Sequence, residues 1–342
     1  MQLKCCILPV IVFTQSNAMK KSLFAIFIVS LCVSCSKTSP SVTTPPVTPV
    51  TPVTPTQSDS LFSWTKTSKP VTTSVFDIWF TSNKTGFITN NTSLFTSTDN
   101  GVTWTPVANT TFPMIFNFQF LDDQTGFVQG DKQIGVTHDG GATWSFVSIS
   151  LKQAWNFQFI TANTGFYCDQ NNGIYKTSDA GNHWQNVSNT NDDIYCFYFL
   201  DSLKGYFMGT HSFNKTVDGG VTWQTISAGA FTNSHFAFYK MQFLDSLNGY
   251  SSSPNGLSKT TDGGVNWTVS LPTTGGDYII PYFFDVNNGY CIANNTIYKT
   301  TNGGLSWTLS CKLANDQFSG LHMLDMNTGW AGTYGGYVLR LQ

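Results

Sequence analysis

The stretch TTDGGVNW, residues 260–267, combines an acid, two glycines and a tryptophan, and related stretches recur along the chain. They share the spacing S/T-x-D/N-x-G-x-x-W and occupy residues 97–104, 137–144, 177–184, 216–223 and 300–307. The third position is held by Asp99, Asp139, Asp179, Asp218, Asp262 and Asn302. A short polar side chain accepts backbone N–H bonds in a tight turn, and glycine supplies positive φ, so the pattern predicts a repeated β-hairpin. Because Asn can make most of the same bonds, we interpret these six residues as structural rather than catalytic.

Tryptophan sets the period of the repeat. The column contains Trp64, Trp104, Trp144, Trp184, Trp223, Trp267 and Trp307, separated by 40, 40, 40, 39, 44 and 40 residues. A second column contains Gly86, Gly126, Gly165, Gly205, Gly249, Gly289 and Gly329, each followed by an aromatic residue. A period near 40 residues indicates seven stacked supersecondary units.

Each unit reads as four short strands. Apolar residues at two-residue spacing precede each glycine of the second column, as Phe118 and Phe120 precede Gly126, and this alternation predicts a strand. A turn that usually begins with Asp follows this first strand, and the second strand begins with the glycine and its aromatic neighbour. A loop then leads to the third strand. The Asp-containing hairpin connects the third strand to the fourth, which begins at the tryptophan. Four strands in about 40 residues are typical of a propeller blade. The sequence therefore predicts an all-β, seven-bladed β-propeller with four-stranded blades.

The two ends of the repeat complement one another. Trp64 has no hairpin stretch before it, while residues 318–342 supply three strands with no tryptophan after them. We expect residues 61–68 to complete blade seven beside GYVLRL, residues 336–341, so that the N- and C-terminal strands close the ring and leave no open sheet at the seam.

The first 60 residues resemble an export signal followed by a tether. Met19 is a better start than Met1, because Lys20 and Lys21 follow it and the short apolar run of residues 23–33 completes a secretory signal. The run is too short to span a membrane. It ends at a small residue before Cys35, which resembles a bacterial lipobox, so we expect cleavage before Cys35 and lipidation of its thiol. The predicted organisation is a leader over residues 1–35, a Thr/Pro-rich linker over 36–60 and the propeller over 61–342. The protein is expected to be exported and lipid-anchored in the bacterial envelope, at the outer membrane.

Composition excludes several classes of protein. Only 11% of the residues are charged and the net charge is −2, so nothing predicts a nucleic-acid partner. The histidines lack metal-ligand spacing, and we expect neither a metal nor another cofactor; they are His138, His183, His211, His235 and His322. The cysteines that follow Cys35 are expected to be buried free thiols; they are Cys168, Cys196, Cys291 and Cys311.

The hairpin stretches and the GWAG sequence at residues 329–332 resemble the photosystem II assembly and stability factor family, part of the Asp-box (BNR-repeat) group of propellers. The resemblance covers the whole predicted ring and implies a chaperone-like role in the assembly of membrane complexes. Photosynthetic members also share a basic, arginine-containing patch, which a chain with Arg340 as its single arginine does not reproduce. Sialidases share the Asp box, but their arginine triad and Tyr–Glu nucleophile pair are excluded here, since the sequence has no glutamate.

We expect a non-enzymatic binding or assembly scaffold, a monomeric propeller whose ligand is an envelope protein or a glycan. The alternative is a carbohydrate-binding propeller or a glycoside hydrolase that uses two Asp residues. Binding is expected on the face where the loops from the fourth to the first strand and from the second to the third strand converge on the channel, opposite the Asp boxes. An insertion, residues 227–236, lies in one of these loops. The candidate binding residues are Trp155, Asn156, Asp192, Asp193, His211, His235, Lys240 and Asp277.

Overall fold

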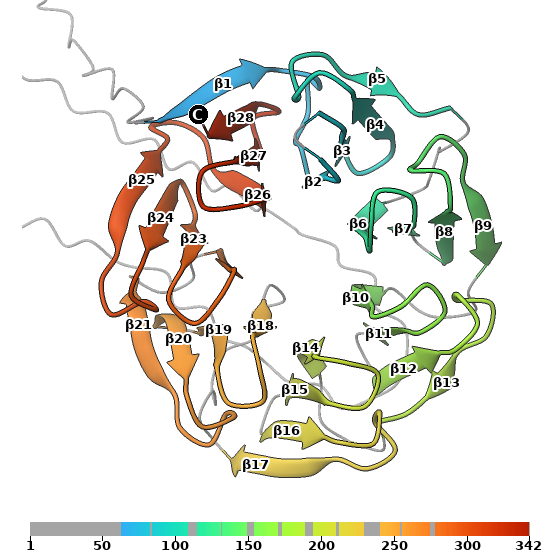
Figure 1. The fold of residues 1–342 in the computed structure, drawn as a ribbon, viewed down its shortest axis with the longest axis vertical. Coiled ribbons are helices and arrows are strands. Elements are labelled where there is room, and N and C mark those ends of the chain that lie inside the picture. The colour runs from blue at the N-terminus through green and yellow to red at the C-terminus, as the bar shows by residue number, and fades with distance from the viewer. Residues whose placement is uncertain are drawn as a thin grey trace, which may run out of the picture. The chain divides into compact units, whose positions relative to one another are not determined.

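The computed structural model describes residues 63–82, 84–108, 115–130, 132–148, 154–169, 173–188, 194–209, 212–228, 240–253, 255–273 and 278–341. The regular elements in these ranges are β-strands, which form seven antiparallel four-stranded sheets around a central channel (Figure 1). The prediction of a seven-bladed all-β propeller is confirmed. The predicted leader and linker precede Ser63 and lie outside the described residues.

The first three blades run from the channel to the rim in chain order. Blade one contains β2 (Asp77–Phe80), β3 (Gly86–Thr89), β4 (Leu94–Ser97) and β5 (Thr105–Pro106). Blade two contains β6 (Ile115–Phe120), β7 (Gly126–Gly130), β8 (Gln133–Thr137) and β9 (Ser145–Ser148). Blade three contains β10 (Ala154–Phe159), β11 (Gly165–Asp169), β12 (Gly173–Thr177) and β13 (Gln185–Asn186).

The next three blades repeat this order, and the seventh borrows one strand from the N-terminal side. Blade four contains β14 (Ile194–Phe199), β15 (Gly205–Gly209), β16 (Ser212–Thr216) and β17 (Gln224–Ala228). Blade five contains β18 (Met241–Phe243), β19 (Gly249–Ser253), β20 (Gly256–Thr260) and β21 (Thr268–Pro272). Blade six contains β22 (Ile279–Phe283), β23 (Gly289–Ala293), β24 (Thr296–Thr300) and β25 (Thr308–Lys312). Blade seven contains β26 (Phe318–Met323), β27 (Gly329–Thr333), β28 (Val338–Leu341) and β1 (Trp64–Ser68).

The ring closes through β1, which lies antiparallel to β28 with Trp64 opposite Leu341. The Trp64 indole is buried and donates a 2.9 Å hydrogen bond to the Ser310 hydroxyl of blade six. The predicted closure by the N- and C-terminal strands is therefore confirmed.

Neighbouring blades are held together by a repeated aromatic stack. At six of the seven joints the aromatic residue after the second-column glycine lies on the last phenylalanine of the next blade's inner strand, as Tyr250 lies on Phe283 with ring centroids 3.5 Å apart; blade seven has Met323 there. The tryptophan of the hairpin then packs edge-on against the same ring, as Trp307 does on Phe283. A glycine is required beside that ring: a Cβ at Gly289 would lie 2.5 Å from Phe283. The sequence columns thus mark one interblade joint repeated around the ring.

The quoted stretch forms the turn between β20 and β21. Asp262 Oδ1 accepts hydrogen bonds from the Thr260 hydroxyl and the Asn266 N–H, both 2.9 Å long. The Thr260 hydroxyl also accepts from the Gly264 N–H at 2.9 Å, and Gly264 has φ of 93°. In blade six, Asn302 Oδ1 accepts the equivalent bond from the Ser306 N–H at 3.0 Å. The hairpin therefore needs a short acceptor at this position rather than an acid.

The antiparallel order gives the propeller two distinct faces. The box face carries the Asp-box hairpins and the turns between the first and second strands of each blade. The loop face carries the connections from the second to the third strand and from each blade to the next.

Candidate functional site

Two of the eight candidate binding residues lie in one cavity. Asn156 and Lys240 both line a hollow of about 340 Å³ in the central channel, at the loop-face ends of the inner strands. Trp155 lies within β10, but the structure does not describe its side chain. The other five candidates lie outside the described residues; they are Asp192, Asp193, His211, His235 and Asp277. Most of the predicted insertion, residues 229–236, also lies outside them, so the role of these residues stays a prediction.

The box-face half of the channel lining is occupied by structural bonds between blades. The Gln119 side chain donates to the Phe159 carbonyl at 2.9 Å and accepts from the Phe159 N–H at 2.8 Å. Gln158 makes the same pair of bonds to Phe199, and Gln242 makes it to Phe283. These amides therefore bridge neighbouring inner strands, and their main role is to hold the ring together.

The loop-face half of the lining contains a carboxyl group and an amine. Asp77 accepts hydrogen bonds from the N–H groups of Ile78, at 2.9 Å, and Phe118, at 3.2 Å. Burial raises the pKa of Asp77 to about 6, against the opposing effects of the positive charge on Lys240 and of these two bonds. Asn117 and Asn156 occupy the position of Asp77 in the next two blades, so polar groups continue around this end of the channel.

An aromatic cluster on the loop face adjoins the channel mouth. Tyr334 lies between Phe76 and Tyr278, with centroid separations of 6.2 and 6.3 Å. Phe76 directly precedes Asp77, and the pKa of Tyr278 is raised by burial, by Tyr334 and by Asp77. Tyr334 and Phe76 are 38% and 40% exposed, which is unusual for large side chains in a fold that buries most of its aromatics.

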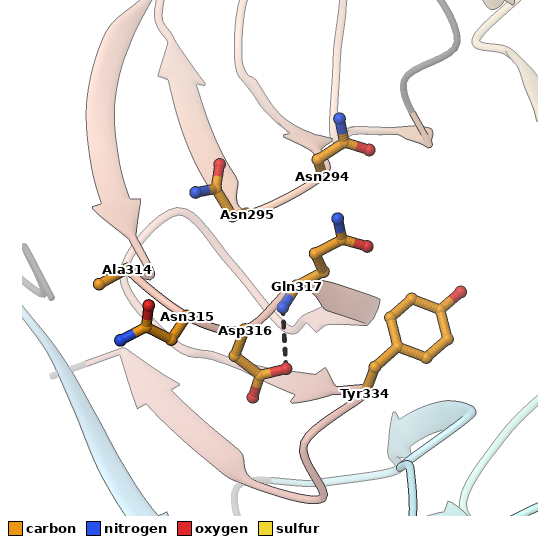
Figure 2. Close-up of a pocket in the computed structure, with 7 residues that line it drawn as sticks. All are labelled: Asn294, Asn295, Ala314, Asn315, Asp316, Gln317 and Tyr334. Carbon is orange, nitrogen blue, oxygen red and sulfur yellow. Dashed lines mark hydrogen bonds between the residues drawn. The ribbon is translucent and has the colours of Figure 1, made fainter. Parts of the chain in front are cut away.

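Tyr334 also forms one wall of a second hollow of about 580 Å³ between blades six and seven (Figure 2). The polar walls come from the β23–β24 loop and the β25–β26 loop; the residues are Asn294, Asn295, Asn315, Asp316 and Gln317. Asp316 Oδ1 accepts from the N–H groups of Gln317 and Gly335, both at 2.8 Å, whereas its buried Oδ2 has no hydrogen-bond partner among the described residues.

The aromatic cluster lies between the two hollows, because Tyr334 lines one of them and Phe76 directly precedes Asp77 of the other. The lining offers aromatic faces, side-chain amides, a carboxylate and an amine, which are the groups that recognise peptides and sugars. Among the described residues each hollow contains one carboxyl group, Asp77 or Asp316, and no group of three potential metal ligands lies together. The described part of the chain also has no helix long and apolar enough to cross a membrane.

Sequence reasoning missed the residues that dominate this surface. Tyr334 lies in a loop of blade seven whose sequence, TYGGY, differs from the NN-containing loops of blades three and six. The difference between this loop and the corresponding loops of other blades was the sequence feature that could have pointed to Tyr334. The contact between Phe76 and Tyr334 could not be seen in the sequence, because these residues are more than 250 positions apart and only the closed ring brings them together.

The fold defines a seven-bladed Asp-box propeller whose loop face carries both hollows. The sequence pattern of the family described as photosynthesis system II assembly factor YCF48 matches residues 56–190 and 188–334. The chain therefore belongs to that family, which confirms the resemblance seen in the sequence. No curated protein is similar enough in sequence to count as a relative.

Solved structures share the fold at low sequence identity. A YCF48 bound to a D1 peptide is 16% identical with a TM-score of 0.65, over 82% of this chain and 96% of that one. YCF48 from Cyanidioschyzon merolae is 17% identical with a TM-score of 0.64, over 82% and 98%. A GH74 xyloglucanase from Xanthomonas campestris is 12% identical with a TM-score of 0.59, over 80% of this chain but 52% of that one. At these identities the likeness shows the fold alone.

Proposed function

We propose that the protein is a non-enzymatic scaffold of the bacterial envelope, anchored through a lipid on Cys35, which captures a segment of a partner protein on the loop face. The observation that carries the proposal is the aromatic cluster of exposed Phe76 and Tyr334 with the more buried Tyr278, which lies between the Asp77 end of the channel and the Asp316 hollow. Rigid aromatic side chains beside amides and a carboxylate suit an extended peptide. Membership of an assembly-factor family, one structure of which is bound to a D1 peptide, supports a protein ligand.

A glycan is the second candidate ligand. An exposed tyrosine beside side-chain amides and a carboxylate, as around Tyr334, also suits a sugar ring. Glycoside hydrolysis is less well supported, since it needs two carboxyl groups on either side of one bond and each described hollow offers one. Hydrolysis would have to draw on Asp192, Asp193 or Asp277, which lie outside the described residues.

The test compares peptide and glycan binding by matched variants. Binders selected from a random peptide library should lose about tenfold in affinity when Tyr334→Ala removes a central aromatic contact. Phe146→Ala is the control, because Phe146 on β9 is also 38% exposed but lies at the rim. Melting temperatures should be measured for both variants. Equal affinities for the wild type and Tyr334→Ala would place the site elsewhere, and selective binding on a glycan array would favour the second candidate.

A further inference from the structure

Exposed aliphatic side chains gather on the box face. Leu203 and Leu247 are 53% and 54% exposed on the first turns of blades four and five, and Val221 and Leu305 are 76% and 85% exposed in Asp-box hairpins. We call the set on blades four to six the aliphatic band; its members are Leu203, Val217, Val221, Leu247, Val265, Val286 and Leu305. Single exposed apolar residues are ordinary, but a group of this size on one face indicates an interaction surface.

Hydrogen bonds hold the turns that carry the band next to one another across the three blades. In blade four the hairpin is joined to the first turn by the Gly219 N–H, which donates to the Leu203 carbonyl at 2.8 Å, and Leu247 accepts the equivalent bond from Gly263 at 2.9 Å. Blade four reaches blade five through the Tyr206 hydroxyl, which donates to the Ser246 carbonyl at 2.9 Å. Blade five reaches blade six through the Tyr250 hydroxyl and the Gly303 carbonyl, at 3.1 Å.

The fold does not require these apolar residues. Where blades four and five have Leu203 and Leu247, the same turn holds Gln124, Asn163 and Asn287 in blades two, three and six. The hairpin position of Val221 and Leu305 holds Asn182 in blade three. The repeat therefore also forms with polar residues at these positions, so the fold alone does not explain the apolar ones.

The tether joins the propeller on the same face. Trp64, at the start of β1, pairs with Leu341 at the end of β28, which is the box-face end of both strands. The residues that precede Ser63 in the sequence are thus attached beside blade seven, next to blade six. Residues 36–62 could reach about 80 Å if extended as polyproline II. A lipid on Cys35 would therefore hold the band within reach of the bilayer without fixing its orientation.

Charge on the band is balanced. Its carboxylates are Asp201, Asp218, Asp245, Asp262 and Asp285, and hydrogen bonds lower the pKa of each. The nearby amines are Lys204, which lies 3.8 Å from Asp201, and the third-strand lysines Lys215, Lys259 and Lys299. Neither sign dominates, so no strong field opposes the approach of a zwitterionic lipid surface.

We propose that the aliphatic band docks onto the phospholipid bilayer that carries the anchor, so that the loop face points away from the membrane toward its partner. The inference rests on the proposed anchoring. Aliphatic side chains on projecting turns suit shallow insertion among lipid headgroups, where each buried group adds a small favourable energy. The tether raises the local concentration of the bilayer and makes such weak contacts sufficient.

A depth-sensitive label tests the docking. A cysteine is introduced by Leu305→Cys or by Val102→Cys and labelled with bimane. The native cysteines should not react, because Cys168, Cys196, Cys291 and Cys311 are buried. The full lipid-modified protein is then reconstituted in phosphatidylcholine vesicles. Val102, in the equivalent hairpin of blade one, is the matched control. Nitroxide-labelled lipid should quench the label at residue 305 several-fold more than the label at residue 102, and aqueous iodide should show the reverse order. Adding Leu203→Asn and Leu247→Asn should abolish the difference at an unchanged melting temperature.

Each other outcome overturns the inference in a recognisable way. If both labels are quenched equally while the protein floats with the vesicles, the docking is wrong and the anchoring stands. If the protein does not float with the vesicles, the proposed lipid anchoring is wrong, and the proposed docking, which depends on it, is wrong as well. If residue 305 is shielded from iodide but not quenched by lipid, a protein or a second copy of the chain covers the band.

Discussion

Two titratable side chains in the channel respond to pH in opposite directions. Burial lowers the pKa of His322 to about 4, although a hydrogen bond with the Phe80 backbone opposes the shift. Burial raises the pKa of Asp77 to about 6. Both groups are therefore held in their neutral forms more strongly in the folded protein than in the unfolded chain.

The sign of each effect on stability follows from the shift. The unfolded chain binds a proton at His322 near pH 6.5, so the His322 contribution is complete above that pH and falls by about 3 kcal/mol as the pH drops to 4. As the pH falls, Asp77 takes up its proton at a higher pH in the folded protein than in the unfolded chain. Its contribution to stability therefore rises as the pH falls from about 6 toward 3.8, which is nearly the pH range in which the His322 contribution is lost. The two effects largely cancel in the wild type.

Single substitutions should separate the pH dependence of stability due to His322 from that due to Asp77. His322→Gln introduces the residue that blades two, three and five hold at this position, and the variant should become more stable as the pH falls from 6 to 4. Asp77→Asn introduces the residue of blades two and three, and the variant should become less stable over that window by about 3 kcal/mol. Urea unfolding at several pH values measures both slopes. Parallel curves for the two variants would show that burial does not set these pKa values.

At the scale of strands and hairpins, the interblade stack sets the stability of the ring. Phe243 is buried between Tyr206, stacked at 3.8 Å, and Trp267, edge-on at 6.1 Å. Blade seven uses Met323 at the equivalent position, packed in one core with Tyr290 of blade six and Trp64. The joint therefore requires apolar volume more than an aromatic ring.

This equivalence gives a graded prediction. Phe243→Ala should lower the free energy of unfolding by about 3–5 kcal/mol, because it leaves a cavity between two blades. Phe243→Met should cost less than about 1.5 kcal/mol, since methionine fills most of the same space. Denaturant unfolding of the two variants measures the difference. If both lost the same amount, ring stacking rather than volume would hold the joint.

Sequence periodicity predicted these elements because every blade repeats the same joint. The columns of Trp, Gly and Phe predicted the strands, the hairpins and the closure by β1, since each residue type is required locally. The binding surface could not be found in this way, because it consists of what differs between blades. Tyr334 has no aromatic equivalent in the other blades, Phe76 meets it only in the closed ring, and the burial that shifts the pKa of Asp77 depends on seven inner strands meeting. The features detectable in advance were departures from a column, such as Tyr334 in its loop and the box-face leucines where other blades have Asn, Gln or Lys.

At the scale of the whole molecule, one short strand decides whether seven blades form a closed ring. β1 supplies the outer strand of blade seven and the buried Trp64, which lies in the same core as Leu339 and Leu341. The Trp64–Ser310 hydrogen bond also ties blade seven to blade six. Without β1, the edge of β28 would be open and would invite pairing with another chain.

Deleting residues 63–68 should therefore destabilise the whole ring rather than one blade. Loss of the fully buried Trp64 alone is expected to cost about 3–5 kcal/mol, and the exposed β28 edge should promote aggregation. Removing residues 36–58 is the control, because it shortens the tether and leaves β1 in place. Thermal melting and light scattering should distinguish the two: the control should match the wild type, while the β1 deletion should melt earlier and form oligomers. A β1 deletion that melted with the wild type and stayed monomeric would show that six complete blades and a three-stranded seventh are enough, and that the terminal pairing is an accessory rather than the closure of the fold.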